Sequence, residues 1–253
     1  MRLRQTRQQR ILEQLADGQE VHVATLADEL GVSSETIRRD LRLLQESNKL
    51  KRVHGGALPV GASPLVPLSE RRIQNPSEKE TIARLSLTLV TEGQSVFLGG
   101  GSTVLAVAET LAEGPPAEFL TVMPDVADAL ARSGRHTVHL TGGEYDPVTR
   151  CLGGEDALQP VRDRMFDLSI MGGSALDPVL GVLDNREMQY RLQRILIERA
   201  RRYALVADHT KFGRGARYCT LPYSALSFLI TDRRPPEAYL EPLLDANVQL
   251  LCP

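Results

Sequence analysis

The sequence lacks the features that define several large classes of protein. Its three cysteines, Cys151, Cys219 and Cys252, are far apart and form no C-x-x-C pair, so we expect neither a disulfide framework nor a cysteine zinc site. The five histidines contain no H-x-x-x-H pair, which gives no support to a zinc hydrolase. No apolar run reaches the ~18–20 residues that span a bilayer, and the basic N-terminus has no apolar segment behind it. We therefore expect a protein of the reducing cytoplasm, with no membrane partner, metal ion or cofactor.

Length and charge are the next constraints. With 253 residues, of which 42% are hydrophobic, the chain can form one large domain or two unequal ones around a substantial core. Residues 1–60 hold ten Lys and Arg against eight Asp and Glu, a net charge of +2, whereas the rest holds 20 against 24, a net charge of −4. A basic head on an acidic body fits an anionic partner such as nucleic acid, although ordinary scatter of surface charge explains the asymmetry equally well.

A segment rich in glycine and proline, residues 55–67, separates two parts of the chain with different sequence patterns. We predict a small domain at residues 1–57, a linker at 58–75 and a larger domain at 76–253. Beyond the linker, short apolar runs alternate with helical patterns, which predicts an α/β domain with a mostly parallel sheet and helices on both faces. The runs are residues 96–98, 119–123, 138–140, 168–171, 203–207, 226–230 and 248–251.

The residue pattern of the small domain, 1–57, predicts three short helices, at residues 5–16, 24–30 and 34–47, followed by a β-hairpin at 50–57. Gly31 breaks the chain before the third helix, and Ser33 or Ser34 can cap that helix. Two helices joined by a short glycine-containing turn predict a helix-turn-helix, in which the second of the two enters the major groove of DNA, and the hairpin predicts a wing.

Polar residues opposite the apolar stripe of the third helix are the candidate contacts to double-stranded DNA. Arginine suits this role because its planar fork bonds guanine or clamps phosphate. The alternative is a solvated face in which the arginines pair with Glu35, Asp40 and Glu46, but the combination of helices, turn and basic hairpin favours DNA. The candidates are Ser34, Thr36, Arg38, Arg39 and Arg42 on the helix, with Arg52 and His54 in the wing.

The stretch LADELGVSSETIRRDL at residues 26–41, followed by RVHGGA at 52–57, resembles the DeoR family of bacterial transcription regulators. The hexapeptide TIRRDL, residues 36–41, is that family's most specific marker. This resemblance implies a winged helix-turn-helix joined to a sensor domain that binds a phosphorylated sugar or related metabolite. It implies a sensor fold similar to the ribose-5-phosphate isomerase and CoA-transferase group, a homo-oligomer (dimer or tetramer), and most often a repressor of sugar-catabolism genes.

Loops at the predicted strand ends independently favour an anion pocket in the body. Ligands of open α/β sheets bind outside the carboxyl ends of the strands, where glycines admit a ligand and helix N-termini offer free N–H groups. One such loop alone is more often a tight turn, and the spacings match neither the dinucleotide nor the Walker motif. The candidate effector-binding residues are Gly99, Gly100, Gly101, Ser102, Thr103, Gly142, Gly143, Asp208 and Lys211.

Two departures from the family pattern concern the sugar-reading part of this pocket. Gly99 stands where the family usually has Asp, and Thr121-Val122 stands where it usually has Thr-Asn. We therefore expect the part of the pocket that holds phosphate to be retained, and the part that recognises the hydroxyls of a sugar to be altered. Two other hypotheses stay open: a constitutive DNA-binding regulator with a degenerate sensor, and a sugar-phosphate isomerase-like enzyme. We expect no catalytic residues, because nothing in the sequence orients a carboxylate base.

Overall fold

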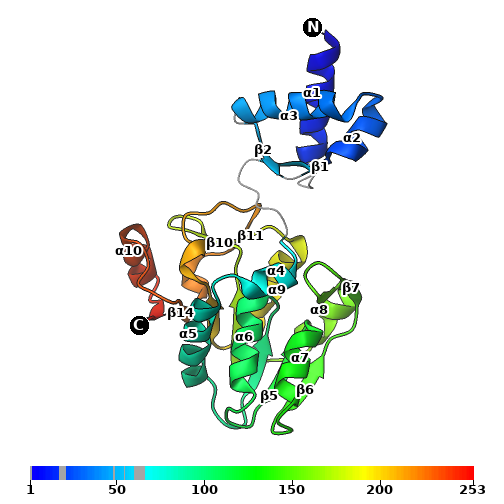
Figure 1. Cartoon of the computed structure of the whole chain (residues 1–253). Coiled ribbons are helices and arrows are strands. Elements are labelled where there is room, and N and C mark those ends of the chain that lie inside the picture. The colour runs from blue at the N-terminus through cyan, green and yellow to red at the C-terminus, as the bar shows by residue number, and fades with distance from the viewer. Residues whose placement is uncertain (1, 17–20, 48, 54, 60–65) are drawn as a thin grey trace. The chain divides into compact units, whose positions relative to one another are not determined.

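The computed structural model describes residues 2–16, 21–47, 49–53, 55–59 and 66–253, and divides the chain into two compact units (Figure 1). The smaller unit comprises Met1–Pro64 and Gly215–Arg217, and the larger comprises Leu65–Arg214 and Tyr218–Pro253. The range predicted as a linker, 58–75, contains the helix α4 (Leu68–Ile73). Leu68 is buried in the core of the larger unit, so α4 belongs to that unit.

The smaller unit combines three helices with a three-stranded antiparallel sheet of order β1-β3-β2. Its elements are α1 (Arg2–Ala16), β1 (Val21–His22), α2 (Val23–Leu30), α3 (Ser34–Glu46), β2 (Leu50–Val53) and β3 (Gly56–Pro59). The predicted helices and hairpin are all present, with ends that differ by up to three residues.

Local chemistry explains the turn between α2 and α3. Gly31 adopts a left-handed conformation (φ 61°) and donates its N–H to the last carbonyls of α2, a position that glycine fills without strain. Ser33, not Ser34, caps α3, since its side chain accepts a hydrogen bond from the Thr36 N–H. Ile37 and Leu41 are buried against α1 and α2, which fixes the outward face of α3.

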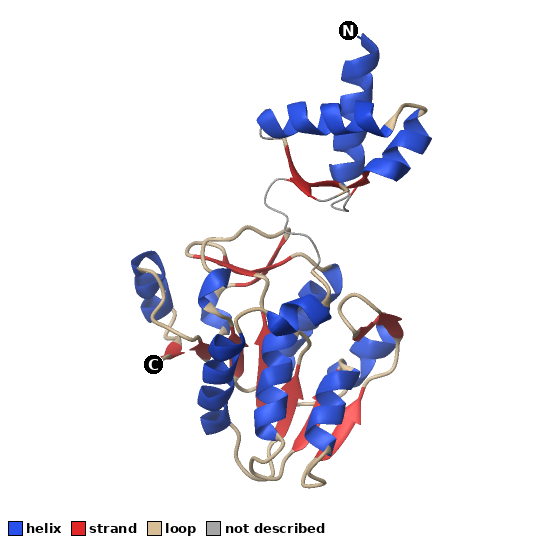
Figure 2. Ribbon diagram, in the orientation of Figure 1, coloured by secondary structure: helices blue, strands red, loops and turns tan. Residues whose placement is uncertain are grey.

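The larger unit is built on a parallel sheet of seven strands, of order β15-β14-β12-β9-β4-β5-β6 (Figure 2). The strands are β4 (Ser95–Leu98), β5 (Glu118–Thr121), β6 (Thr137–Leu140), β9 (Leu168–Gly172), β12 (Tyr203–Val206), β14 (Phe228–Ile230) and β15 (Gln249–Leu251). Each of the seven predicted apolar runs forms one of them. Because all pair in parallel, their carboxyl ends lie along one edge of the sheet.

Helices cover both faces of this sheet, as predicted. The helices are α5 (Pro76–Ser86), α6 (Ser102–Leu111), α7 (Pro124–Ala131), α8 (Glu155–Arg162), α9 (Glu187–Arg199) and α10 (Glu237–Asp245). On one face α5, α6 and α7 lie side by side and bury one apolar cluster (Figure 1), while α8, α9 and α10 contribute to a second cluster that includes Phe97 and Leu205. None of the helices in the described ranges has both the length and the apolar character needed to cross a membrane.

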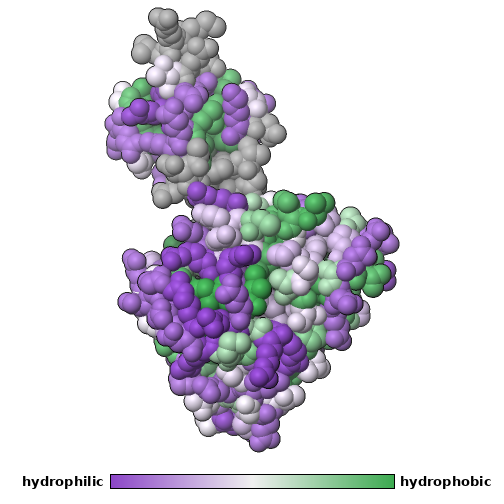
Figure 3. All heavy atoms as spheres, turned by 180° about the vertical axis from the view of Figure 1, so that it is seen from behind, coloured by the Kyte–Doolittle hydropathy of each residue, from purple (hydrophilic) through white to green (hydrophobic). Residues whose placement is uncertain are grey.

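Two small antiparallel elements lie beyond the sequence prediction. They are the hairpin β7 (Glu144–Asp146) with β8 (Cys151–Gly153), and a sheet of β10 (Ala175–Asp177), β11 (Gly181–Asp184) and β13 (Tyr218–Leu221). Seen from behind, the larger unit presents a mostly hydrophilic surface interrupted by apolar areas (Figure 3).

Candidate DNA interface and anion site

The outward face of α3 carries the predicted DNA contacts. Arg38, Arg39 and Arg42 are exposed, opposite the buried stripe, while Ser34 and Thr36 are half-buried at the start of the helix. These positions follow from the helical repeat, because the apolar residues at i, i+4 and i+7 take the inner face.

Ion pairing leaves most of this charge available. Arg38 Nη1 lies 3.4 Å from Glu35 Oε2, but both groups are exposed, and such pairs contribute little. Asp40 is buried and turns toward α1, where its carboxylate accepts a hydrogen bond of 2.5 Å from Arg7 Nε. Arg39 and Arg42 have no ion-pair partner within the described ranges. Of these three arginines, only Arg38 has, among the described residues, the acidic partner that the alternative of a solvated, paired face predicts.

The wing is attached directly to α3. The N–H of Arg52 in β2 donates a hydrogen bond of 3.0 Å to Gln45 Oε1, and the side chain of Arg52 is exposed. β2 pairs with β3 from Leu50 opposite Pro59 to Val53 opposite Gly56. His54, the other wing residue predicted to contact DNA, lies outside the described residues.

In the larger unit, the loop Gly99–Gly101 leaves the carboxyl end of the interior strand β4 and starts α6. A Cβ atom at position 99 would lie 2.5 Å from the Met171 Sδ, and one at position 100 would lie 2.3 Å from the Cys151 Sγ. The Gly101 N–H donates a hydrogen bond of 3.4 Å to the Met123 Sδ. Sulfur-bearing side chains therefore surround the loop, and its first two glycines make room for them.

Arg71 of α4 lies at the start of α6, where the sequence analysis did not place it. Its Nη1 is 3.7 Å from the Cβ position of Gly101. Its Nε and Nη2 are shielded from solvent and have no hydrogen-bond partner among the described residues. Burial, followed by repulsion from Arg186, lowers the pKa of Arg71 below its usual range. Shielded N–H groups of a cation without a partner are costly, so this guanidinium is suited to an anion.

Two lysines add to the positive charge around Arg71. Lys79 of α5 is buried, and its Nζ donates to the carbonyl oxygens of Arg71 and Gln74, which holds the end of α4 in place. Lys211 lies in the 3₁₀ turn η2 (His209–Lys211) after β12, and its amine has no hydrogen bond or ion pair within the described ranges. Burial lowers the pKa of each lysine, although the nearby Asp208 opposes that shift.

Acidic side chains limit this positive charge. Asp208 is buried and caps η2 by accepting a hydrogen bond of 2.9 Å from the Thr210 N–H. Asp184 is fully buried and binds the Arg186 Nε at 3.1 Å, so Arg186 is already neutralised. Of the four cations described above, Arg71 and Lys211 have no acidic partner in a hydrogen bond or ion pair within the described ranges and are left for a ligand.

The other predicted effector residues separate into two groups. Ser102 and Thr103 are half-buried in the first turn of α6, beside Arg71. Gly142 and Gly143 follow β6, and their nearest neighbours are Asp156, Gly153 and Ala157, so they pack against β8 and α8. Val122, at the second position that departs from the family pattern, is buried in the apolar core.

Residues 7–60 match the DeoR-like helix-turn-helix domain, and residues 74–233 match the DeoR C terminal sensor domain. The chain belongs to the DeoR family of transcriptional regulators. It is 33% identical over 237 residues to the glycerol-3-phosphate regulon repressor of Escherichia coli K12, a match that covers 92% of this chain and 94% of the relative. It is 31% identical over 230 residues to the transcriptional repressor AccR of Agrobacterium fabrum, which covers 90% and 89% of the two chains.

Both relatives are named as repressors and neither as an enzyme, and membership of a family of transcriptional regulators gives no support to the isomerase-like enzyme considered above. A solved structure of ribose 5-phosphate isomerase A from Neisseria gonorrhoeae is similar with a TM-score of 0.40 and 17% identity, over 54% of this chain and 53% of that one.

Proposed function

We propose that this DeoR-family regulator represses genes for sugar or carbohydrate catabolism and leaves its operator when a phosphorylated sugar or related metabolite binds. In this proposal residues 1–57 bind DNA through α3 and the wing, and residues 76–253, together with α4, bind the effector. Ser34, Thr36, Arg38, Arg39 and Arg42 face the major groove, and Arg52 and His54 contact the DNA beside it. A single winged head makes few contacts, so a dimer or tetramer supplies affinity by placing two heads on a palindromic site.

The buried, unpaired nitrogens of Arg71 carry the effector part of the proposal. A phosphate can accept two parallel hydrogen bonds from a guanidinium, and the first turn of α6 adds N–H groups and the hydroxyls of Ser102 and Thr103. Lys211 supplies the second positive charge. The E. coli relative is named for the regulon of a phosphorylated compound, which is consistent with this ligand class.

A constitutive regulator is the second candidate, and the neighbourhood of Gly99 favours it. Met171 occupies the space that a side chain at position 99 would need, and Val122 is part of the core. Neither position offers a polar group to sugar hydroxyls. This candidate predicts the same DNA affinity in the presence and absence of every metabolite.

Thermal unfolding of the full chain with a panel of sugar phosphates and the matching free sugars tests the proposal. A ligand that binds only the folded state at 100 times its dissociation constant adds ~2.7 kcal/mol to the free energy of unfolding. We expect a shift with one phosphorylated compound, no shift with its free sugar, and release of the protein from its own promoter DNA by the same compound. Stability and DNA affinity that no compound changes would contradict the effector proposal and support the constitutive regulator.

A further inference from the structure

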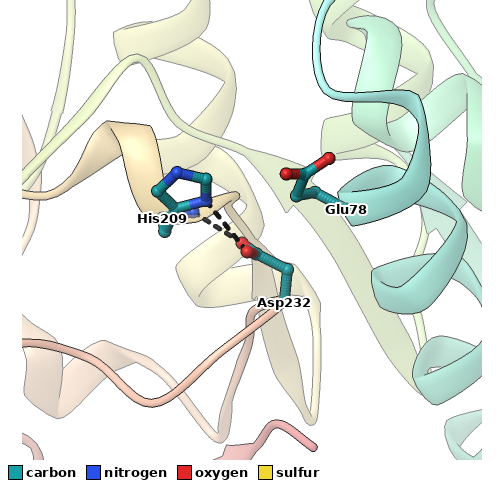
Figure 4. A group of neighbouring side chains, drawn as sticks. All are labelled: Glu78, His209 and Asp232. Atoms are coloured by element: carbon teal, nitrogen blue, oxygen red, sulfur yellow. Dashed lines mark hydrogen bonds and ion pairs between the residues drawn. The ribbon is translucent and has the colours of Figure 1, made fainter.

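Three metal-ligating side chains converge close to the anion site. Glu78 comes from α5, His209 from η2 and Asp232 from the segment after β14. Each offers one ligand atom, and these atoms all lie within 4.8 Å of one another. The imidazole and the two carboxylates point toward one another across the space between these elements (Figure 4).

The positions of two of the ligands are fixed by the fold. Asp232 accepts hydrogen bonds from the His209 N–H at 2.6 Å and from its ring Nδ1 at 2.9 Å. Ligand atoms around an ion with bonds of ~2.0–2.2 Å lie roughly 3–3.6 Å from one another, so only small movements are needed to close the group on a metal. The Asp232 side chain is 3% exposed, whereas those of Glu78 and His209 are 21% and 32% exposed, which leaves an approach from solvent.

A cation already lies between the two carboxylates. Arg233 places its Nε 2.9 Å from Asp232 Oδ2 and its Nη2 3.6 Å from Glu78 Oε1. The Arg233 side chain is 58% exposed, and an exposed ion pair of this kind contributes little free energy. A divalent ion brings twice the charge to the same place, and the guanidinium is free to move into water.

We propose that Glu78, His209 and Asp232 bind one divalent first-row transition-metal ion, such as Zn²⁺, with water completing its coordination. One imidazole and two carboxylates suit Zn²⁺, Fe²⁺ or Mn²⁺ better than Mg²⁺, which keeps its waters and prefers oxygen ligands. The site stands apart from the proposed effector function, because it uses none of the residues assigned to the ligand. It departs from the sequence analysis, which expected no metal because the cysteines and histidines show no C-x-x-C or H-x-x-x-H spacing.

The location of this site indicates what a metal ion does to the fold. Glu78 precedes Lys79 on α5, and His209 follows Asp208 and shares η2 with Lys211. An ion held by both elements fixes their separation, and with it the spacing of the two lysines around the anion site.

The test is a titration of the metal-free full chain with Zn²⁺, in competition with a chromophoric chelator and without DNA or effector. We expect one saturable ion per chain, at least tenfold weaker binding in Glu78→Gln and in Asp232→Asn, and tighter binding in Arg233→Ala, which lacks the competing guanidinium. Mg²⁺ at the same concentration should not compete.

Two matched controls separate this site from others. Glu80→Gln removes an exposed carboxylate on the same helix, and Cys219→Ser removes an exposed thiol; neither should change the Zn²⁺ affinity. If Asp232→Asn unfolds, as its buried hydrogen bonds allow, Glu78→Gln decides the outcome. Absence of saturable binding, or equal affinity in the parent chain and Glu78→Gln, would overturn the proposal.

Discussion

Arg39 on α3 and Arg71 on α4 both lack an ion-pair partner within the described ranges, but they differ in their access to water. Arg39 is exposed, and hydration stabilises its charge at no cost to the fold. Two nitrogens of Arg71 are shielded from solvent and bonded to nothing among the described residues. An unpaired cation therefore indicates a ligand in the larger unit far more strongly than in the smaller one, where helix geometry and family membership carry the assignment.

The substitution Arg71→Ala should give the largest effect. Loss of a buried, charge-assisted contact should weaken binding of the sugar phosphate that gives the largest thermal shift by ~2–5 kcal/mol. The ligand-free chain should be no less stable, because the variant removes a desolvated charge. Isothermal calorimetry and thermal unfolding measure the two effects. Arg72→Ala is the matched control, since Arg72 is exposed and pairs with Glu109 at 3.0 Å; an equal loss in both variants would remove Arg71 from the site.

An intermediate effect is expected for Arg39→Ala. Affinity for the operator should fall by ~1–3 kcal/mol if Arg39 contacts a base. Stability should stay within about 0.5 kcal/mol of the parent, as for most surface substitutions. Fluorescence anisotropy with labelled promoter DNA measures the affinity, and Arg84→Ala on α5 is the control. Unchanged operator affinity in Arg39→Ala would count against α3 as the groove helix.

The smallest effect is expected for Glu35→Gln, which breaks the exposed pair with Arg38. The free energy of unfolding should fall by less than about 1 kcal/mol, the sum of a surface ion pair and a favourable charge at a helix N-terminus. Urea denaturation followed by circular dichroism measures it. A larger loss would show that this face of α3 has a structural role, as the paired-face hypothesis holds.

The two units also differ in how far the sequence predicts them. In the smaller unit, the described residues assigned to DNA lie on α3 and β2, so the helical repeat, the Gly31 turn and the hairpin pattern are enough to predict where they lie. The seven strands of the larger unit are also predicted from local sequence, because each is a continuous apolar run.

The candidate anion site is harder to predict from the sequence, because its residues come from distant segments that only the fold brings together. Gly99–Thr103 and Lys211 follow strands, where ligands of such sheets usually bind. Arg71 precedes the first strand of the sheet and lies in the range predicted as a linker, 58–75. Only the shielded, unbonded nitrogens of its guanidinium in the fold indicate that it belongs to the candidate site. Gly142 and Gly143 have the same composition as a ligand loop, and in the fold Gly143 lies against the carbonyl of Gly153 in β8.

The close approach of Met171 to Gly99 makes any side chain at position 99 depend on position 171. A side chain can enter position 99 only when the Met171 thioether is shortened or turned away, since its Sδ lies 2.5 Å from the required Cβ. A carboxylate at position 99 therefore requires either a smaller residue at position 171 or another rotamer of Met171. Moving the thioether opens space without adding chemistry, and only the new side chain at position 99 adds a group able to recognise a hydroxyl.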